Sequence, residues 1–168
     1  MSVENTKKNN LKSKGFTLVE VLVATLVLSI VITATSGILT VNLINATDIK
    51  NSYVASGLTQ EGMELARNIR DSGWFAGTPY NNSLPDGTYR LQWNSSGFMA
   101  LGTNPPLAED PSTGIYAYDF GSPTIFKRTI NIATVVPNVE KKVTVTVTWT
   151  DRGISKSISA EDHLFNWR

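Results

Sequence analysis

The sequence has no cysteine and one histidine, and charged residues fill only 17% of its 168 positions. Without cysteine the chain has no disulfide scaffold, no thiolate metal site and no cysteine nucleophile. An apolar fraction of 41% and a net charge of +1 exclude a solvated disordered chain, which needs low hydrophobicity and high net charge. So small a net charge also gives no general reason to expect nucleic acid as a partner.

Charge is almost absent from one long stretch near the N-terminus. Residues 15–47 hold a single ionisable side chain, Glu20, whereas residues 1–15 hold four lysines against one glutamate. As a helix, residues 16–40 would span about 37 Å, enough to cross a bilayer core of ~30 Å. The preceding lysines predict a single-pass membrane segment with a cytoplasmic N-terminus and the rest of the chain outside.

Glu20 needs an explanation, because an ionised carboxylate near the bilayer centre costs roughly 2.5–3.5 kcal/mol. One explanation is an interfacial carboxylate that faces the lipid headgroups. The other is a cationic partner in an assembly, since residues 21–47 contain no cation. An ordinary secretory signal, cleaved just before Gly37, is a further alternative, but this segment is longer than a usual signal core of ~7–15 residues.

The residues around Glu20 form a specific pattern, in which Gly15-Phe16-Thr17-Leu18-Val19-Glu20 follows a basic leader and opens the apolar run. This pattern resembles the N-terminal signature of type IV prepilins and type II secretion pseudopilins, closely over residues 1–40 and loosely to about residue 70. The resemblance implies that a prepilin peptidase removes residues 1–15 as a leader by cleaving between Gly15 and Phe16, and that the new Phe16 amine is N-methylated. It also implies that Glu20 pairs with the terminal amine of a neighbouring subunit and sets the register of a filament.

One position departs from the family pattern. Many members have proline at the twenty-second mature residue, where this chain has Gly37. Glycine in a helix costs ~1 kcal/mol relative to alanine, so the helix can form there and yet unwind easily. We expect a point of helix flexibility at Gly37, with close helix packing as the alternative.

From residue 41 the pattern becomes amphipathic. The spacing predicts that the transmembrane helix of residues 16–40 continues over residues 41–73, with ion pairs from Arg67 to Glu64 and to Asp71. Gly73 is the predicted C-terminal stop, so the helix would run from residue 16 to about residue 72 and reach roughly 85 Å. Five residues at helical spacing form its apolar stripe: Leu58, Gly62, Leu65, Ala66 and Ile69.

Residues 74–168 change to a period of two, which is typical of strands. Valines and Trp149 alternate with threonines over residues 143–149, and Asp151-Arg152-Gly153 predicts a turn into a second strand over residues 154–159. Further strands are expected within residues 89–93, 115–120 and 124–135. We therefore predict four to six strands and an α+β, pilin-like fold, with a long N-terminal helix packed on a small antiparallel β-sheet head.

The head offers few candidates for chemistry. Glu109 and Asp110 in the expected surface loop of residues 102–114 could donate oxygen ligands to calcium, although no ligand spacing supports a metal site, and we expect no cofactor. His163 stands alone beside Asp162 and the chain has no Gly-x-Ser-x-Gly elbow, so we expect no enzyme activity. The basic pairs at 127–128 and 141–142 are expected on solvated faces, not on nucleic acid.

The leading interpretation is a structural subunit of a type IV pilus or a type II secretion pseudopilus. The partners that the resemblance implies are the prepilin peptidase with its N-methyltransferase activity, other pilin or pseudopilin subunits, the inner-membrane assembly platform and the lipid bilayer. The segment of residues 58–70 resembles, more loosely, the corresponding helix of minor pilins and of the secretion pseudopilin I group. The alternative is a membrane-anchored module whose head binds a ligand or DNA without entering a filament.

Overall fold

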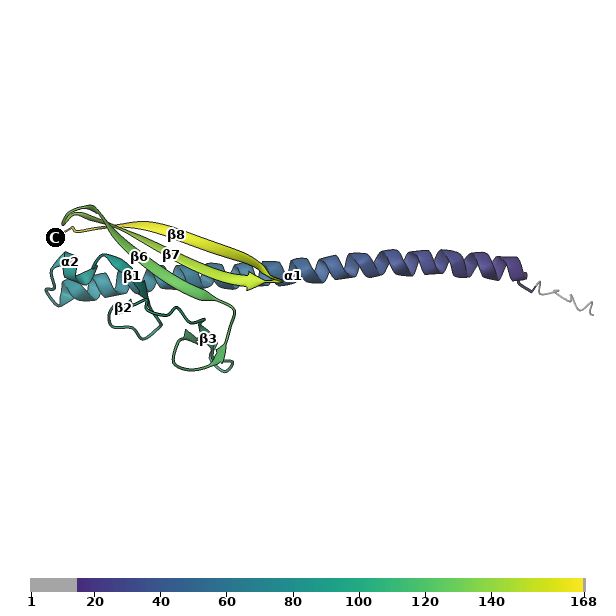
Figure 1. Ribbon diagram of the computed structural model, residues 1–168, viewed down its shortest axis with the longest axis horizontal. Coiled ribbons are helices and arrows are strands. Elements are labelled where there is room, and N and C mark those ends of the chain that lie inside the picture. The colour runs from purple at the N-terminus through teal and green to yellow at the C-terminus, as the bar shows by residue number, and fades with distance from the viewer. Residues whose placement is uncertain (1–14, 168) are drawn as a thin grey trace, which may run out of the picture. The chain divides into compact units, whose positions relative to one another are not determined.

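The computed structural model describes residues 15–167 of a chain that forms two compact units, Met1–Asn45 and Ala46–Arg168. One helix, α1 (Leu18–Phe75), begins in the first unit and ends in the second (Figure 1). Most of the expected leader, residues 1–14, lies outside the described residues. Each unit is considered by itself below.

In the first unit, α1 is apolar all round. An 18-residue window of α1 has a mean hydropathy of 2.4, and none of that window is buried within the chain. A helix with apolar side chains on every side needs an apolar environment around it. By length and composition α1 can therefore cross a membrane, as the sequence predicts.

In the second unit, α1 buries one face against the sheet. Gly62 belongs to this face because a Cβ there would lie 2.8 Å from Val145 Cγ1. Leu65 of the predicted stripe is only partly buried, and the stripe is otherwise confirmed. The buried residues of α1 are Ala55, Leu58, Thr59, Gly62, Met63, Ala66, Ile69 and Arg70.

The helix does not stop at Gly73, so that prediction was wrong. The Gly77 N–H donates to Trp74 O at 3.1 Å and the Thr78 N–H donates to Gly73 O at 2.9 Å, which is a Schellman termination. Gly77 takes the left-handed position with φ +74°, where a side chain would be strained. Gly73 has a different task, because a Cβ there would collide with the Ser83 side chain.

The head contains a five-stranded antiparallel sheet in the order β2-β1-β6-β7-β8, which lies along α1 (Figure 1). The helix is followed by a short helix, α2 (Tyr80–Ser83), before the first strand. The sheet strands are β1 (Gly87–Arg90), β2 (Met99–Ala100), β6 (Lys127–Val136), β7 (Glu140–Asp151) and β8 (Ile154–Phe165). This arrangement confirms the α+β, pilin-like fold.

A second, three-stranded sheet has the order β4-β3-β5, with β3 (Ala108–Glu109), β4 (Tyr116–Ala117) and β5 (Ser122–Pro123). The described chain thus has eight strands, more than the four to six predicted. The extra strands hold two residues each, too few to show a period of two in the sequence. The surface loop expected at residues 102–114 is also anchored, because Leu107 is fully buried.

The β7–β8 hairpin confirms the predicted turn. Arg152 and Gly153 form a two-residue turn with φ angles of 50° and 79°, and Asp151 pairs with Ile154. Positive φ at both turn residues matches the right-handed twist of the two strands. The second strand extends to Phe165, six residues beyond the predicted end, because pairing with β7 continues to Glu140.

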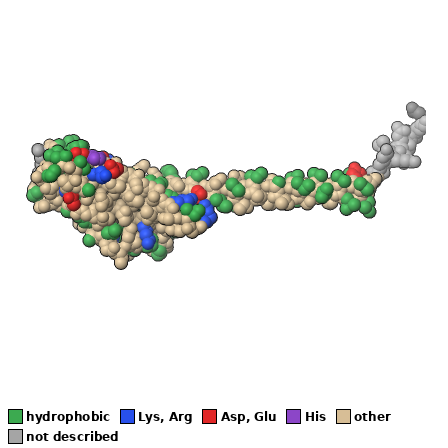
Figure 2. Space-filling view, turned by 45° about the horizontal axis from the view of Figure 1, so that its top comes forward, with side chains coloured by type: hydrophobic (Ala, Val, Ile, Leu, Met, Phe, Trp, Pro, Cys, Tyr) green, Lys and Arg blue, Asp and Glu red, His purple; other side chains and the backbone are tan. Residues whose placement is uncertain are grey.

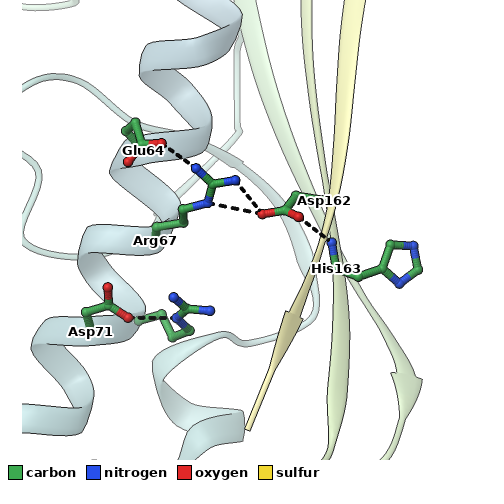
Figure 3. Close-up of polar contacts among 6 residues, drawn as sticks. Glu64, Arg67, Asp71, Asp162 and His163 are labelled. Carbon is green, nitrogen blue, oxygen red and sulfur yellow. Dashed lines mark hydrogen bonds and ion pairs between the residues drawn. The ribbon is translucent and has the colours of Figure 1, made fainter. Parts of the chain in front are cut away.

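Two clusters of buried side chains hold the sheet on α1. Arg67 adds an ion pair across the same interface, with its Nη2 2.7 Å from Asp162 Oδ2 on β8 (Figure 3). Arg67 also pairs with Glu64, as predicted, but Asp71 pairs with Arg70 instead of Arg67. Most of the larger cluster comes from Met63, Ala66, Ile69, Leu91, Ile130, Ile132, Val143 and Val145, and the smaller one from Ala55, Leu58, Leu107, Phe126, Val147 and Trp149.

Candidate processing and assembly site

The Gly15–Phe16 bond lies in the exposed, non-helical stretch of residues 15–17 that precedes Leu18, the first residue of α1. Phe16 is 81% exposed, and a Cβ added at Gly15 would meet nothing within 4 Å. A protease needs an accessible, extended bond, which a regular helix does not offer. The local geometry around Gly15 and Phe16 is therefore compatible with cleavage.

Thr17 caps the helix that follows. Its Oγ1 accepts the Glu20 backbone N–H at 3.3 Å, and its carbonyl oxygen accepts the Val21 N–H at 3.2 Å. Thr-x-x-Glu at a helix start is the sequence of a capping box, a signal that our sequence reasoning missed. The cap places Glu20 in the first turn of α1, where the helix dipole favours a carboxylate.

The Glu20 carboxylate is exposed and makes no hydrogen bond or ion pair with any of the residues 15–167. The Glu20 carboxylate is therefore free to bind a cation from outside residues 15–167. Other polar groups of the apolar segment are satisfied locally: the Thr25, Ser29, Thr33, Ser36 and Thr40 hydroxyls each donate to a carbonyl three or four residues earlier. Glu20 differs from them because its carboxylate has no partner among residues 15–167.

Gly37 lies inside regular helix. The Ser36 hydroxyl donates to Ile32 O at 2.9 Å and the Thr40 hydroxyl donates to Ser36 O at 3.1 Å on either side of it. A Cβ at Gly37 would meet nothing within 4 Å, so no contact within the described chain requires glycine there. The flexibility expected at Gly37 stays a prediction.

The candidate calcium ligands do not converge. The Ser112 N–H donates to the Asp110 carboxylate at 3.0 Å and, with the Thr113 and Ser112 hydroxyls, lowers the pKa of Asp110. Glu109 lies in β3, where its carboxylate interacts with the Tyr116 hydroxyl. Within residues 15–167 no group of three or more acidic, histidine or cysteine side chains is placed to hold a metal ion.

Two residues of the basic pairs are not on solvated faces, so that expectation was wrong for them. Arg128 is 0% exposed and donates to Leu58 O at 3.0 Å, to Leu91 O at 2.6 Å and to Glu61 at 3.0 Å. Lys141 is also buried and lies 2.7 Å from Asp86 Oδ1. Both cations bind partners on other segments, which no local pattern shows.

Residues 10–36 match the family model of the prokaryotic N-terminal methylation motif. The match includes Gly15, Phe16 and Glu20, and it confirms the resemblance seen in the residues themselves. It ends one residue before Gly37 and contains no residue of the head. No curated protein and no solved structure matches the chain.

Proposed function

Because the chain carries the prepilin-type N-terminal methylation signature, we propose that it is a structural subunit of a type IV pilus or a type II secretion pseudopilus. A prepilin peptidase cleaves it between Gly15 and Phe16 and methylates the new Phe16 amine. Before assembly the chain is held in the inner membrane by α1, with its N-terminus in the cytoplasm. The inner-membrane assembly platform then moves α1 from lipid into a bundle of neighbouring subunits.

The observation that carries this proposal is the unpaired carboxylate of Glu20. It stands at the start of a helix that is otherwise apolar, and no described residue offers it a cation. Cleavage after Gly15 removes the leader and creates an α-amine, a cation that can pair with the Glu20 carboxylate. A buried ion pair adds little net stability over apolar packing, but a carboxylate left alone in an apolar bundle costs much more. Pairing with a neighbour's amine therefore fixes the axial register at which subunits join.

Gly37 eases the movement of α1 from the lipid bilayer into the filament. A helix that leaves a bilayer and enters a bundle must fit two different packings, and glycine lowers the cost of local unwinding by ~1 kcal/mol relative to alanine. We expect Gly37→Ala to slow incorporation into filaments while leaving membrane insertion unchanged. If Gly37→Ala and the wild type entered filaments equally well, flexibility at Gly37 would have no role in assembly.

The proposal is tested by filament incorporation in cells that carry the assembly machinery. Glu20→Gln keeps the size of the side chain but removes its charge, and Glu20→Leu removes its polarity as well. Both variants should be processed and membrane-bound, yet both should be depleted at least about tenfold from sheared filaments, because ~1.4 kcal/mol already corresponds to tenfold.

Ser29→Ala is the matched control, since the Ser29 hydroxyl bonds only to its own helix, at 2.7 Å from Leu26 O. It should enter filaments as well as the wild type does. If Glu20→Leu entered filaments as well as Ser29→Ala, the carboxylate would have no part in assembly and the proposal would lose its support.

A further inference from the structure

One stripe of α1 in the head remains uncovered by the sheet. Its six residues are spaced three or four positions apart, so they lie on one side of the helix, and all six are exposed. The stripe consists of Lys50, Tyr53, Gly57, Gln60, Glu64 and Asn68. Its N-terminal end is basic and its C-terminal end is acidic.

The basic end has an unused cation. Lys50 and Lys127 are the two lysines among residues 15–167 that make no ion pair with a described carboxylate. Two residues before Lys50, the Asp48 carboxylate forms ion pairs with both Arg152 and Lys156. In Figure 2, Lys and Arg side chains gather where α1 enters the head.

The acidic end is a hollow of about 380 Å³ between α1 and the segment after β1. Glu61, Glu64 and Asp71 line it together with Trp93, and Arg67 is the cation that lines it. The side chains of Glu64 and Asp71 are 68% and 46% exposed although each pairs with an arginine, so carboxylate surface remains open to a further cation. Arg67 also forms an ion pair with Asp162 on β8 (Figure 3).

Trp93 adds a second feature that suits a cation. The side chain is 51% exposed in a hollow that carries three carboxylates. An ammonium group is attracted both to carboxylates and to the face of an indole ring. A lysine side chain is long and flexible enough to reach into such a hollow from a neighbouring surface.

We propose that the stripe is a contact between copies of this chain, in which Lys50 of one copy enters the acidic hollow formed by Glu61, Glu64, Asp71 and Trp93 of the next. The inference rests on the proposed filament function. Lys50 precedes Glu64 by 14 residues and Asp71 by 21, which along a helix is about 21 Å and about 32 Å. Two parallel copies displaced by such a distance bring the opposite charges together.

This contact joins two different surfaces, so it repeats from copy to copy and suits an open filament. Anionic lipid headgroups would match the basic end alone and leave the hollow without a role. Charge complementarity of this kind sets partner choice and register more than affinity. The contact thus complements the register that Glu20 sets at the other end of α1.

The absence of cysteine makes a direct test clean. Tyr53→Cys and Asn68→Cys, introduced together, place one thiol near Lys50 and one near the hollow without removing any of the proposed charges. A short bismaleimide added to sheared filaments should then produce a ladder of covalent oligomers. Tyr53→Cys combined with Ser157→Cys on β8 is the control pair, and it should give no ladder, because the two residues do not belong to one contact.

Charge reversal gives an independent readout. Lys50→Glu should lower incorporation into filaments by about threefold to tenfold, and Asp71→Lys added to it should restore incorporation to within about twofold. Lys127→Glu reverses the other lysine that has no carboxylate partner among residues 15–167, and it should have no effect. Unfolding followed by tryptophan fluorescence should be the same for Lys50→Glu as for the wild type, since Lys50 is exposed.

The inference is overturned if filaments contain the chain but the Tyr53/Asn68 pair gives no ladder, or if Lys50→Glu and Lys127→Glu behave alike. It is also overturned if Lys50→Glu weakens binding to phosphatidylglycerol vesicles and leaves incorporation unchanged, which would assign Lys50 to lipid. Absence of the wild-type chain from filaments would remove the proposed function as well, so the two failures are distinguishable.

Discussion

Arg128 is the buried cation on which the attachment of the sheet to α1 depends. Its guanidinium is fully buried, and it joins Leu58 O and Glu61 on α1 to Leu91 O beyond β1. Loss of the buried member of an ion pair typically costs 3–5 kcal/mol. Here it leaves Leu58 O and Leu91 O without the Arg128 donor and the Glu61 carboxylate, which is 34% exposed, without its cation. We expect Arg128→Ala to lower the free energy of unfolding by about 3–5 kcal/mol out of a total of ~5–15.

The assay is urea unfolding of the full chain in detergent micelles. All four tryptophans lie at or after Trp74, so their fluorescence reports on the head and not on the apolar half of α1. With an m-value of about 2 kcal/mol/M, the midpoint should fall by roughly 2 M. Lys142→Ala is the control: it removes a half-exposed ion pair with Glu161, at 3.3 Å, and should cost at most about 1 kcal/mol.

A double variant separates the causes. Arg128→Met keeps an apolar stem of similar length but strands the Glu61 carboxylate, so adding Glu61→Gln should recover part of the loss. A loss below about 1 kcal/mol for Arg128→Ala, or no recovery in the double variant, would refute this account of Arg128.

Three further results are expected from the same head. Gly73→Ala should lower the free energy of unfolding in urea by about 1–3 kcal/mol, because its Cβ collides with Ser83. Gly57→Ala lies in open space on the same helix and should raise it by about 0.5–1 kcal/mol. Equal effects of the two variants would show that Gly73 is not needed for packing. Gly77→Ala should cost roughly 1 kcal/mol because φ is +74° there, and an unchanged midpoint would mean that another residue ends the helix. Hydrogen bonding to Glu140 raises the pKa of His163, so the pair should stabilise the fold fully below about pH 6.5 and lose this effect as the pH rises through the raised pKa. NMR titration of the His163 ring should show the raised pKa. His163→Gln should flatten the dependence of the free energy of unfolding on pH.

The features that the sequence predicts correctly are those set by neighbouring residues. The apolar run, the pattern from Gly15 to Glu20 and the alternation of valine and threonine in β7 each express one local rule. The turn at Arg152 and Gly153 belongs to the same class, because two positive φ angles depend on two adjacent residues. For these elements the sequence was sufficient.

The features that it missed depend on distant segments. Arg128 and Lys141 appear as parts of ordinary basic pairs until the fold brings Glu61 and Asp86 beside them. Gly73 and Gly77 are both reasonable stops for the helix, and only the position of Ser83 shows that Gly73 is needed for packing. The Thr-x-x-Glu pattern at Thr17 is local and visible in the sequence, and the structure uses its Thr17 half, in which the Thr17 hydroxyl accepts the Glu20 backbone N–H.

The central claim is that the chain is processed at one bond and then assembled. Intact-mass and N-terminal mass spectrometry of the chain, expressed with and without a prepilin peptidase, tests it most directly. We expect loss of residues 1–15 and a methylated Phe16 only when the peptidase is present. An intact leader despite active peptidase, or a mature N-terminus near Gly37, would contradict the account.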